Sequence, residues 1–406
     1  MSEIFDVIVV GGGPSGASAA YRLAAGGRSV LVLEQAPMPR HKLCGGAVSE
    51  QALQYLDFAV PKELYEWECF GARVHYAGRS VGVRSDSRVA VLVSRARFDK
   101  FLLDRAQEKG AEVRFEQVRR MEIEGDRVLA TTESRQYGGR LAIVANGAAS
   151  ALAQLVRPKD GPDAMGYCLE QVYGRAHRQD SEGPDHWGNI GSAPEKSSGA
   201  RQDDGLVDVF FGVSGFGYGW IFPHGETRSI GVGGLGSLFP NPRDAMRQFW
   251  VARGLPEDAL KPKGWPIPCG GISRRIVSER LILAGDAAGF VDAFNGEGIA
   301  HAIRSGQLAA QTASDALRAE DFSEAFLARA VRSSHTELRT HLRYSLRIAR
   351  LMHNHPSLFI RLMATEPKLL RKYLLVAQNR LTYRGFFVWL LSRLPLLSLR
   401  LLASAG

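Results

Sequence analysis

The chain has 406 residues, of which 45% are hydrophobic, and this length suits two intertwined domains with a sizeable core. Its formal net charge is +9, but no recognised nucleic-acid motif accompanies the basic residues, so nucleic-acid binding is not expected. The four cysteines have no Cys-x-x-Cys spacing, so neither a zinc site nor a disulfide framework is indicated. Because no signal peptide precedes the first strand, we expect a protein of the reducing cytoplasm.

A glycine-rich segment follows the first predicted strand. The β-branched run at 7–10 indicates a buried parallel strand, and the glycines after it have the G-x-G-x-x-G spacing. This spacing allows a tight turn, close approach of a pyrophosphate, and packing of a helix at 15–26 on the strand. A carboxylate after the second strand, at 30–33, can accept hydrogen bonds from a ribose. The segment predicts a dinucleotide site made of Gly11, Gly13, Pro14, Ser15, Gly16 and Glu34.

A cysteine follows a basic loop. Cys44 comes directly after His41-Lys42-Leu43 and precedes Gly45 and Gly46, so the backbone here can approach a flat ring. Nearby cations favour a thiolate, which makes Cys44 a candidate proton donor. The alternative is a small apolar side chain packed in a loop, because free cysteine is usually buried and inert.

The order of the predicted elements indicates two interleaved domains. Strands at 72–76, 80–84 and 89–93 are expected to begin a substrate sheet, whereas a helix at 98–109 and a strand at 112–115 return to the nucleotide domain. The polar stretch at 179–205 is expected to be a mobile or disordered loop. The predicted fold is therefore α/β, with a Rossmann-like dinucleotide-binding domain, a β-sheet substrate domain and a C-terminal α-helical region. The nucleotide-binding domain is expected to consist of 1–55, 96–165 and 271–330. The substrate domain is expected to consist of 56–95 and 166–270, and the helical region of 331–406.

Three aromatic residues alternate in the predicted substrate domain. Tyr218, Trp220 and Phe222 should lie on one face of a strand that ends at Pro223, with a returning hairpin strand at 230–234. They predict the wall of an apolar pocket for a long hydrocarbon, although plain core packing is the alternative. The histidine that follows, at position 224, is a second candidate proton donor.

A second glycine-rich segment lies almost 270 residues after the first. A buried strand at 281–284 leads into Gly285 and Asp286, and Gly296 and Gly298 open a helix at 299–310. The aspartate can bond a ribityl or ribose hydroxyl, and the helix N-terminus can stabilise negative charge on a reduced isoalloxazine. A simple nicotinamide dehydrogenase has no evident need for this second site, so the pair of segments favours a flavin.

The C-terminal region, 331–406, is strongly basic. It holds 13 Lys and Arg against two acidic residues, and Arg339, Arg343, Arg347 and Arg350 recur along one helical face. No run reaches the roughly 18–20 uncharged residues that span a bilayer. Basic, leucine-rich helices favour peripheral contact with an anionic leaflet on the inner face of the cell membrane. The alternatives are a cap on the substrate domain, a dimer contact or a solvated charged face, so the oligomeric state stays open.

These motifs together resemble the geranylgeranyl reductase family, within the glutathione-reductase and p-hydroxybenzoate-hydroxylase superfamily of FAD proteins. The resemblance covers about residues 1–310 and rests on the two glycine segments, on Lys-Leu-Cys-Gly-Gly at 42–46, on Tyr-Gly-Trp-Ile-Phe-Pro at 218–223, and on the R-x-x-F-D helix start at 95–99. It implies FAD as cofactor, places Cys44, Gly45 and Arg95 beside it, and places the aromatic strand at the substrate cavity. Asn146-Gly147 stands where relatives usually have Asp-Gly.

The resulting prediction is an FAD-dependent reductase that saturates carbon–carbon double bonds of a polyprenyl chain on a lipid or quinone. Hydride from flavin N5 would reach one alkene carbon, and Cys44 would help to protonate the other. The external reductant is expected to be NADPH, a ferredoxin or a quinol. The alternatives are a flavin-dependent monooxygenase or halogenase, and a non-catalytic flavoprotein that binds lipid or relays electrons.

Overall fold

The computed structural model describes residues 4–174, 204–269 and 274–403. The predicted stretch at 179–205 therefore lies almost entirely outside the described residues. An eight-stranded sheet forms the nucleotide domain, with β1 (Ile4–Val10) in parallel pairing with both β2 (Val30–Leu33) and β11 (Gln136–Val144). These strands are mostly buried, and helices pack beside them, with α1 (Pro14–Ala25) in contact with both α3 (Arg95–Glu108) and α5 (Ile299–Ala319).

The same sheet collects short strands from distant parts of the chain. The predicted strand at 112–115 is confirmed as β8 (Glu112–Arg114), which pairs with β2. The hairpin of β9 (Arg120–Glu124) and β10 (Arg127–Thr131) pairs with β11. Besides β1 and β10, β11 also pairs with β18 (Leu281–Leu283), which is followed in the sheet by β17 (Val277–Ser278). The strand before each glycine segment thus belongs to one sheet, which brings the two segments to the same edge.

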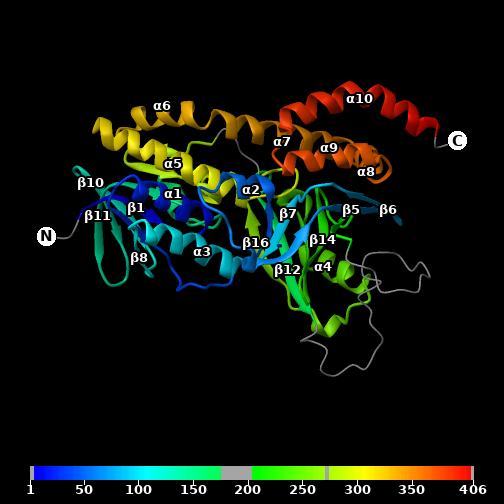
Figure 1. Ribbon diagram of the computed structural model, residues 1–406, viewed down its shortest axis with the longest axis horizontal. Coiled ribbons are helices and arrows are strands. Elements are labelled where there is room, and N and C mark those ends of the chain that lie inside the picture. The colour runs from blue at the N-terminus through cyan, green and yellow to red at the C-terminus, as the bar shows by residue number, and fades with distance from the viewer. Residues whose placement is uncertain (1–3, 175–203, 270–273, 404–406) are drawn as a thin grey trace.

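A seven-stranded sheet forms the second layer, and α4 (Pro242–Val251) packs on one of its faces (Figure 1). Its strands are, in spatial order, β16 (Lys263–Ile267), β12 (Gly166–Gly174), β15 (Thr227–Leu235), β14 (Gly217–His224), β13 (Leu206–Phe211), β5 (Gly71–Tyr76) and β6 (Arg79–Arg84).

The prediction that the strand at 89–93 joins the substrate sheet is wrong. This strand, β7 (Ala90–Val93), lies in a separate three-stranded sheet between β3 (Ala47–Ser49) and β4 (Tyr65–Cys69). The chain turns back after β6, so that β7 pairs antiparallel with β4 rather than continuing along the edge of the large sheet. In the sequence, β3 is followed directly by the short helix α2 (Glu50–Tyr55).

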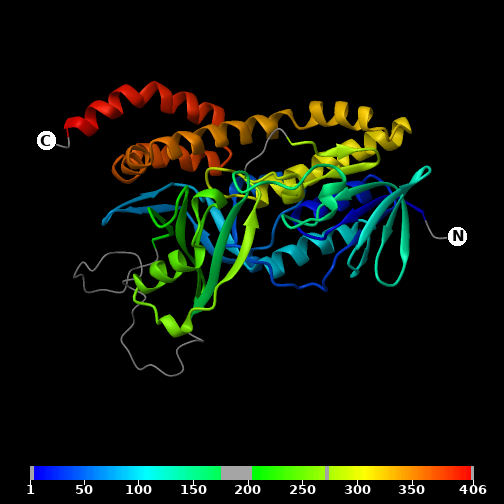
Figure 2. The same cartoon turned by 180° about the vertical axis from the view of Figure 1, so that it is seen from behind.

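A helical layer covers both sheets on one side, as Figures 1 and 2 show from opposite directions. It begins with α5 and continues through α6 (Glu324–Ser334), α7 (Thr336–Asn354), α8 (Pro356–Thr365), α9 (Pro367–Ala377) and α10 (Tyr383–Ala403). The helices α8 and α9 lie over β5 and β6 and enclose a separate apolar core with buried Phe294, Phe359, Tyr383 and Phe386. Within the described parts of the chain, no helix is both long and apolar enough to cross a bilayer.

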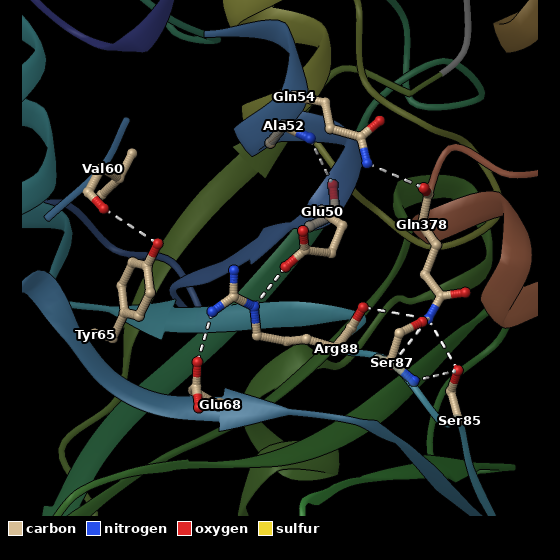
Figure 3. Close-up of polar contacts among 11 residues, drawn as sticks. Glu50, Ala52, Gln54, Val60, Tyr65, Glu68, Ser85, Ser87, Arg88 and Gln378 are labelled. Atoms are coloured by element: carbon tan, nitrogen blue, oxygen red, sulfur yellow. Dashed lines mark hydrogen bonds and ion pairs between the residues drawn. The ribbon is translucent and has the colours of Figure 1, made fainter. Parts of the chain in front are cut away.

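The end of α9 is fixed by polar contacts to the loop between β6 and β7, which leads into the three-stranded sheet (Figure 3). Gln378 is 3% exposed, and its amide nitrogen lies 2.9 Å from the Ser85 hydroxyl and 2.9 Å from the Ser87 carbonyl oxygen. In the same region Arg88 bridges Glu50 on α2 and Glu68 on β4. Because a buried amide is costly to leave unpaired, these contacts define where the helical layer meets the sheets.

Candidate active site

A cavity of about 750 Å³ lies where the two sheets meet the helical layer. One end is formed by the glycine segments and Glu34, and the middle by the Cys44 loop and β14. The far end is apolar and reaches the C-terminal helices through Phe294, Met352, Leu370, Leu374 and Ala377. The cavity therefore joins a dinucleotide-type site to a hydrocarbon-lined channel.

The first glycine segment has the shape that a dinucleotide requires. Gly11 has a φ of +102°, and a Cβ there would lie 2.6 Å from the Ala145 carbonyl oxygen. A Cβ on Gly16 would lie 1.8 Å from the Gly11 oxygen, whereas one on Gly13 would meet only the end of Arg40 at 3.5 Å. The close contacts set the turn, and the open position at Gly13 lets a phosphate approach the backbone.

Two polar groups at this end suit a flavin dinucleotide. The Ser15 hydroxyl, at the start of α1, is buried without a hydrogen-bond partner in the described protein, and it lines the cavity where phosphate would meet the helix N-terminus. Glu34 is 3% exposed and accepts a 2.7 Å hydrogen bond from the Gly12 amide, while Arg40 pairs with its other oxygen at 3.2 Å. An orphaned hydroxyl and a fixed carboxylate fit a pyrophosphate and a ribose respectively.

The second glycine segment packs directly on the first. Gly285 has a φ of +59°, and a Cβ there would lie 2.9 Å from the Ser15 Cβ. Asp286 lines the cavity, and burial raises its pKa while the charges of Lys42 and Arg95 oppose that rise. Gly298 precedes α5, whose first turn faces the cavity, and Gly296 lines the same wall. The structure thus brings together the two segments that the sequence singled out.

Arg95 begins α3, as the R-x-x-F-D pattern predicts, and contacts the cavity. Its guanidinium makes two hydrogen bonds to Asp99, of 2.8 and 2.9 Å, and Asp99 is fully buried. Burial by itself would lower the pKa of Arg95, but the Asp99 carboxylate and the Cys44 sulfur raise it above its ordinary value. Arg95 is therefore a permanent positive charge between the Cys44 loop and Asp286.

The Cys44 loop lies on the aromatic strand. A Cβ on Gly45 would come within 3.0 Å of the Phe222 ring, and one on Gly46 would lie 2.6 Å from the His224 ring. Cys44 itself is half-buried, lines the cavity and accepts a 3.4 Å contact from the Gly46 amide. The two most specific sequence motifs are thus one structural unit, and both glycines are required by the rings beneath them.

The structure places all three aromatic side chains of β14 on the cavity side of the sheet. Consecutive ring centroids of Tyr218, Trp220 and Phe222 lie 6.1 and 6.2 Å apart. The intervening Ile221 packs on the α4 side, where a side chain on Gly219 would meet Phe249. The alternation therefore separates a cavity face from a core face.

Pro223 does not end the strand, so that prediction is wrong. β14 continues to His224, and the predicted return strand is confirmed as β15, with Pro223 opposite Arg228 in the hairpin. Proline is tolerated because the pairing of β14 with β13 stops at Ile221, so β13 requires no backbone N–H from position 223. His224 bonds the Gly45 carbonyl oxygen at 3.0 Å and the Glu66 carboxylate at 2.6 Å, outside the cavity lining. Its contacts support a loop-holding role more directly than proton donation.

Sequence reasoning gave no site role to two polar residues of the cavity, Glu170 and Cys168, which point into it from β12. Lys42, known from the sequence only as part of the Cys44 motif, has its ammonium 4.0 Å from the centre of the Trp265 ring. Burial and the charge of Arg95 lower the pKa of Lys42. The signal available for Glu170 was weak, because a lone acid in a strand is more often exposed than buried.

The fold and the cavity define a flavin-binding oxidoreductase, and comparisons with known proteins agree. The family model described as FAD dependent oxidoreductase matches residues 6–66. A geranylgeranyl diphosphate reductase of Rhodobacter capsulatus is 31% identical over 338 residues, covering 80% of this chain and 79% of that protein. A digeranylgeranylglycerophospholipid reductase of Methanocaldococcus jannaschii is 27% identical, covering 85% and 86%, and a menaquinone reductase of Mycobacterium tuberculosis is 30% identical, covering 75% and 76%.

Solved structures show the same fold at greater distance. A geranylgeranyl bacteriochlorophyll reductase-like protein of Thermoplasma acidophilum superposes with a TM-score of 0.75 at 21% identity, covering 98% of both chains. The flavin-dependent brominase Bmp2 superposes with a TM-score of 0.68 at 18% identity, covering 94% of both chains. On the sequence relationships above, the chain belongs to the geranylgeranyl reductase family of FAD-dependent oxidoreductases. The predicted family, fold class, cofactor and enzyme class are confirmed.

Proposed function

We propose that this enzyme saturates carbon–carbon double bonds in the polyprenyl chain of a lipid or quinone. The observation that carries the proposal is the continuity of the cavity, which runs from the glycine segments past the Cys44 loop to the apolar end under α7 and α9. A long hydrocarbon lying along this path would present its double bonds beside the flavin site. The polyprenyl substrates of the named relatives support the same class.

Reduced FAD, when bound, supplies hydride at N5. The protein's part is to hold and surround the reactants. Gly11, Gly13 and the start of α1 would hold the pyrophosphate, and Glu34 a ribose. The rings of Tyr218 and Trp220 would hold the alkene in a cavity from which water is excluded. There the position of the double bond, rather than its polarisation, would lower the activation barrier of the reduction. Cys44, on the cavity wall, would give the proton to the second carbon.

The test is an anaerobic single turnover. Protein reduced with dithionite is mixed with geranylgeranyl diphosphate, a digeranylgeranyl phospholipid or menaquinone, and the products are weighed by mass spectrometry. Flavin reoxidation with mass gains in steps of two hydrogens is expected for at least one substrate. If the flavin stays reduced until oxygen is admitted and a peroxyflavin absorbance then forms, oxygen insertion or halogenation replaces this proposal.

The apolar end can be tested by shortening it. Leu374→Trp places a large ring where the channel meets α9, and Leu374 is buried. We expect fewer double bonds reduced in a long chain, with little change for a short prenyl substrate. Arg371→Trp on the same helix is the matched control, because Arg371 is exposed. Equal effects of both variants on long and short chains would contradict this path.

We further propose that 331–406 docks on an anionic bilayer from the cytoplasmic side. Arg343, Arg347 and Arg350 are exposed on α7, and Val388 and Leu391 on α10 are 57% and 45% exposed. A basic face beside exposed apolar side chains suits the lipid interface. Arg343→Glu/Arg347→Glu should reduce flotation with phosphatidylglycerol vesicles.

Charge reversal elsewhere controls for net charge. Arg119→Glu/Arg120→Glu changes the total charge equally, at exposed positions on or beside β9. This variant should float as the wild type does. Binding to phosphatidylcholine vesicles at the same level as to anionic ones, or a concentration-dependent dimer in place of vesicle binding, would contradict membrane docking.

The electron donor is proposed to be NADPH, a ferredoxin or a quinol. A second G-x-G-x-x-G spacing occurs at 231–236, but those glycines lie in β15 and just after it, not in a strand–turn–helix unit. Gly231 is required there by Trp220, because a Cβ would lie 2.2 Å from its ring. Anaerobic flavin reduction by each donor in turn distinguishes the three.

A further inference from the structure

An acidic residue of β12 stands on the cavity side of the substrate sheet. Glu170 is 3% exposed and lines the cavity, and its strand neighbours in register are Gly231 on β15 and Lys263 on β16. No ion pair to Glu170 occurs among the residues that the structure describes. A buried, unpaired carboxyl group in a sheet is costly as an anion, so its presence calls for a chemical reason.

The two oxygens of Glu170 differ in their hydrogen bonding. The Ser229 hydroxyl donates a 2.6 Å hydrogen bond to Oε1, and the Trp220 indole N–H donates a 3.0 Å hydrogen bond to the same hydroxyl. Oε2 is buried and has no hydrogen-bond partner in the described chain. This arrangement suits a neutral carboxylic acid, which can carry its proton on Oε2 toward the cavity.

The surroundings favour the same form. Burial raises the pKa of Glu170, and the Ser229 hydrogen bond, the His224 charge, the Cys44 amide and the Lys42 charge oppose that rise only in part. Cys168, two residues earlier on the same strand, is a much weaker acid, because burial raises its pKa above the ordinary value of a thiol. The titratable groups that face Glu170 from the elements around it are Lys42, Cys44, Cys168, His224 and Lys263.

We propose that Glu170 is a proton-supplying residue that acts through Cys44, an inference that rests on the proposed function. In each turnover the alkene gains hydride from the reduced flavin on one carbon and the Cys44 thiol proton on the other. Cys44 is left as a thiolate, Glu170 returns a proton to its sulfur, and the resulting Glu170 carboxylate regains a proton from water. The sum is one C=C bond reduced by one hydride from the reduced flavin, which is left oxidised, and by one proton drawn from solvent.

The test separates Glu170 from its hydrogen-bonded neighbour. In wild type, repeated turnover should slow as pH rises through the Glu170 pKa, because the acid form is required. Glu170→Gln keeps the size and the acceptor for Ser229 but has no acidic proton, so kcat should fall by at least tenfold while KM stays nearly unchanged. The decrease of kcat at high pH, which is the pH limb assigned to Glu170, should also disappear. Ser229→Ala keeps the acid and removes the bond that favours the anion, so the limb should move to higher pH.

An independent measurement needs no substrate. The infrared difference spectrum of wild type minus Glu170→Gln should show a protonated carboxyl band at neutral pH. A missing band, or a Glu170→Gln enzyme with wild-type kcat and the same pH limb, overturns the proton-supply role and leaves the proposed function standing. A wild type that reduces no polyprenyl substrate overturns the proposed function itself, and the role of Glu170 with it.

Discussion

Replacing Gly45 by alanine tests whether the Cys44 loop and the aromatic strand form one unit. Gly45 does not have a left-handed backbone, so alanine introduces no backbone strain there. The added Cβ would lie 2.9 Å from Phe222 Cδ2, 3.0 Å from its Cε2 and 3.3 Å from the Trp220 indole nitrogen. Either the ring tilts toward the core or the loop lifts into the cavity, and both displace the wall beside Cys44.

The size of the effect follows from the overlap. Overpacking of this kind costs about 1–3 kcal/mol. If that strain falls on the reactive geometry, kcat/KM drops roughly 5- to 150-fold, since about 1.4 kcal/mol corresponds to a factor of ten. FAD content should stay near the wild-type value, because the glycine segments and Glu34 are not contacted by the new methyl group.

The assay is anaerobic reoxidation of the reduced flavin by substrate, with FAD content measured from the absorbance of the purified protein. Phe222→Ala removes the contacted ring atoms, so the double variant should be less impaired than the product of the two single effects. Gly161→Ala, whose Cβ meets nothing within 4 Å, controls for a general effect of alanine. Independent effects of Gly45→Ala and Phe222→Ala would refute direct packing as the cause.

Three further changes test other parts of the structure. Asp99→Asn leaves the Arg95 guanidinium buried without its counter-ion, so the free energy of unfolding in urea should fall by about 3–5 kcal/mol. Tyr218→Phe removes the hydrogen bond that Tyr218 donates to the Asn295 carbonyl oxygen, so the melting temperature should fall by an amount equivalent to about 1 kcal/mol, and an unchanged value would refute that contact. His335 is fully buried, and burial lowers its pKa to about 3, so between that value and 6.5 the unfolded chain binds more protons and stability rises with pH. His335→Leu should therefore shrink the difference in unfolding free energy between pH 5 and pH 8 by about 2 kcal/mol, as measured by denaturant titration at both pH values.

Short-range patterns predicted much of the fold. The glycine spacing at Gly11–Gly16 depends on a turn whose contacts lie within a few residues or at the end of a neighbouring strand, so it predicted both β1 and α1. Alternation at 218–222 likewise predicted a strand with one aromatic face. In both cases the spacing of residues in the sequence directly reflects the local geometry of the backbone, either a turn or the alternation of side chains along a strand.

Long-range pairing escaped prediction. The sheet to which β7 belongs is decided by its contacts with β3 and β4, and nothing in the pattern at 89–93 distinguishes one apolar sheet from another. Glu170 was missed for the same reason, because its partner Ser229 lies 59 residues away on β15, and Ser229 in turn accepts a hydrogen bond from Trp220 on β14. The catalytic and binding roles of the individual site residues stay predictions.

The loop before α5 connects the flavin site with the C-terminal helices. The Asn295 amide donates a 2.7 Å hydrogen bond to the Tyr373 hydroxyl on α9, while the Asn295 carbonyl oxygen accepts from Tyr218 on β14. Asp292 in the same loop accepts a hydrogen bond from Ser345 on α7. A loop held by the substrate sheet on one side and by the basic helices on the other cannot move independently of either. If the helices dock on a bilayer as proposed above, a displacement of α7 and α9 would reach the cavity wall through this loop. Because Leu370 and Leu374 of α9 also line the cavity, the helical layer forms part of the active site.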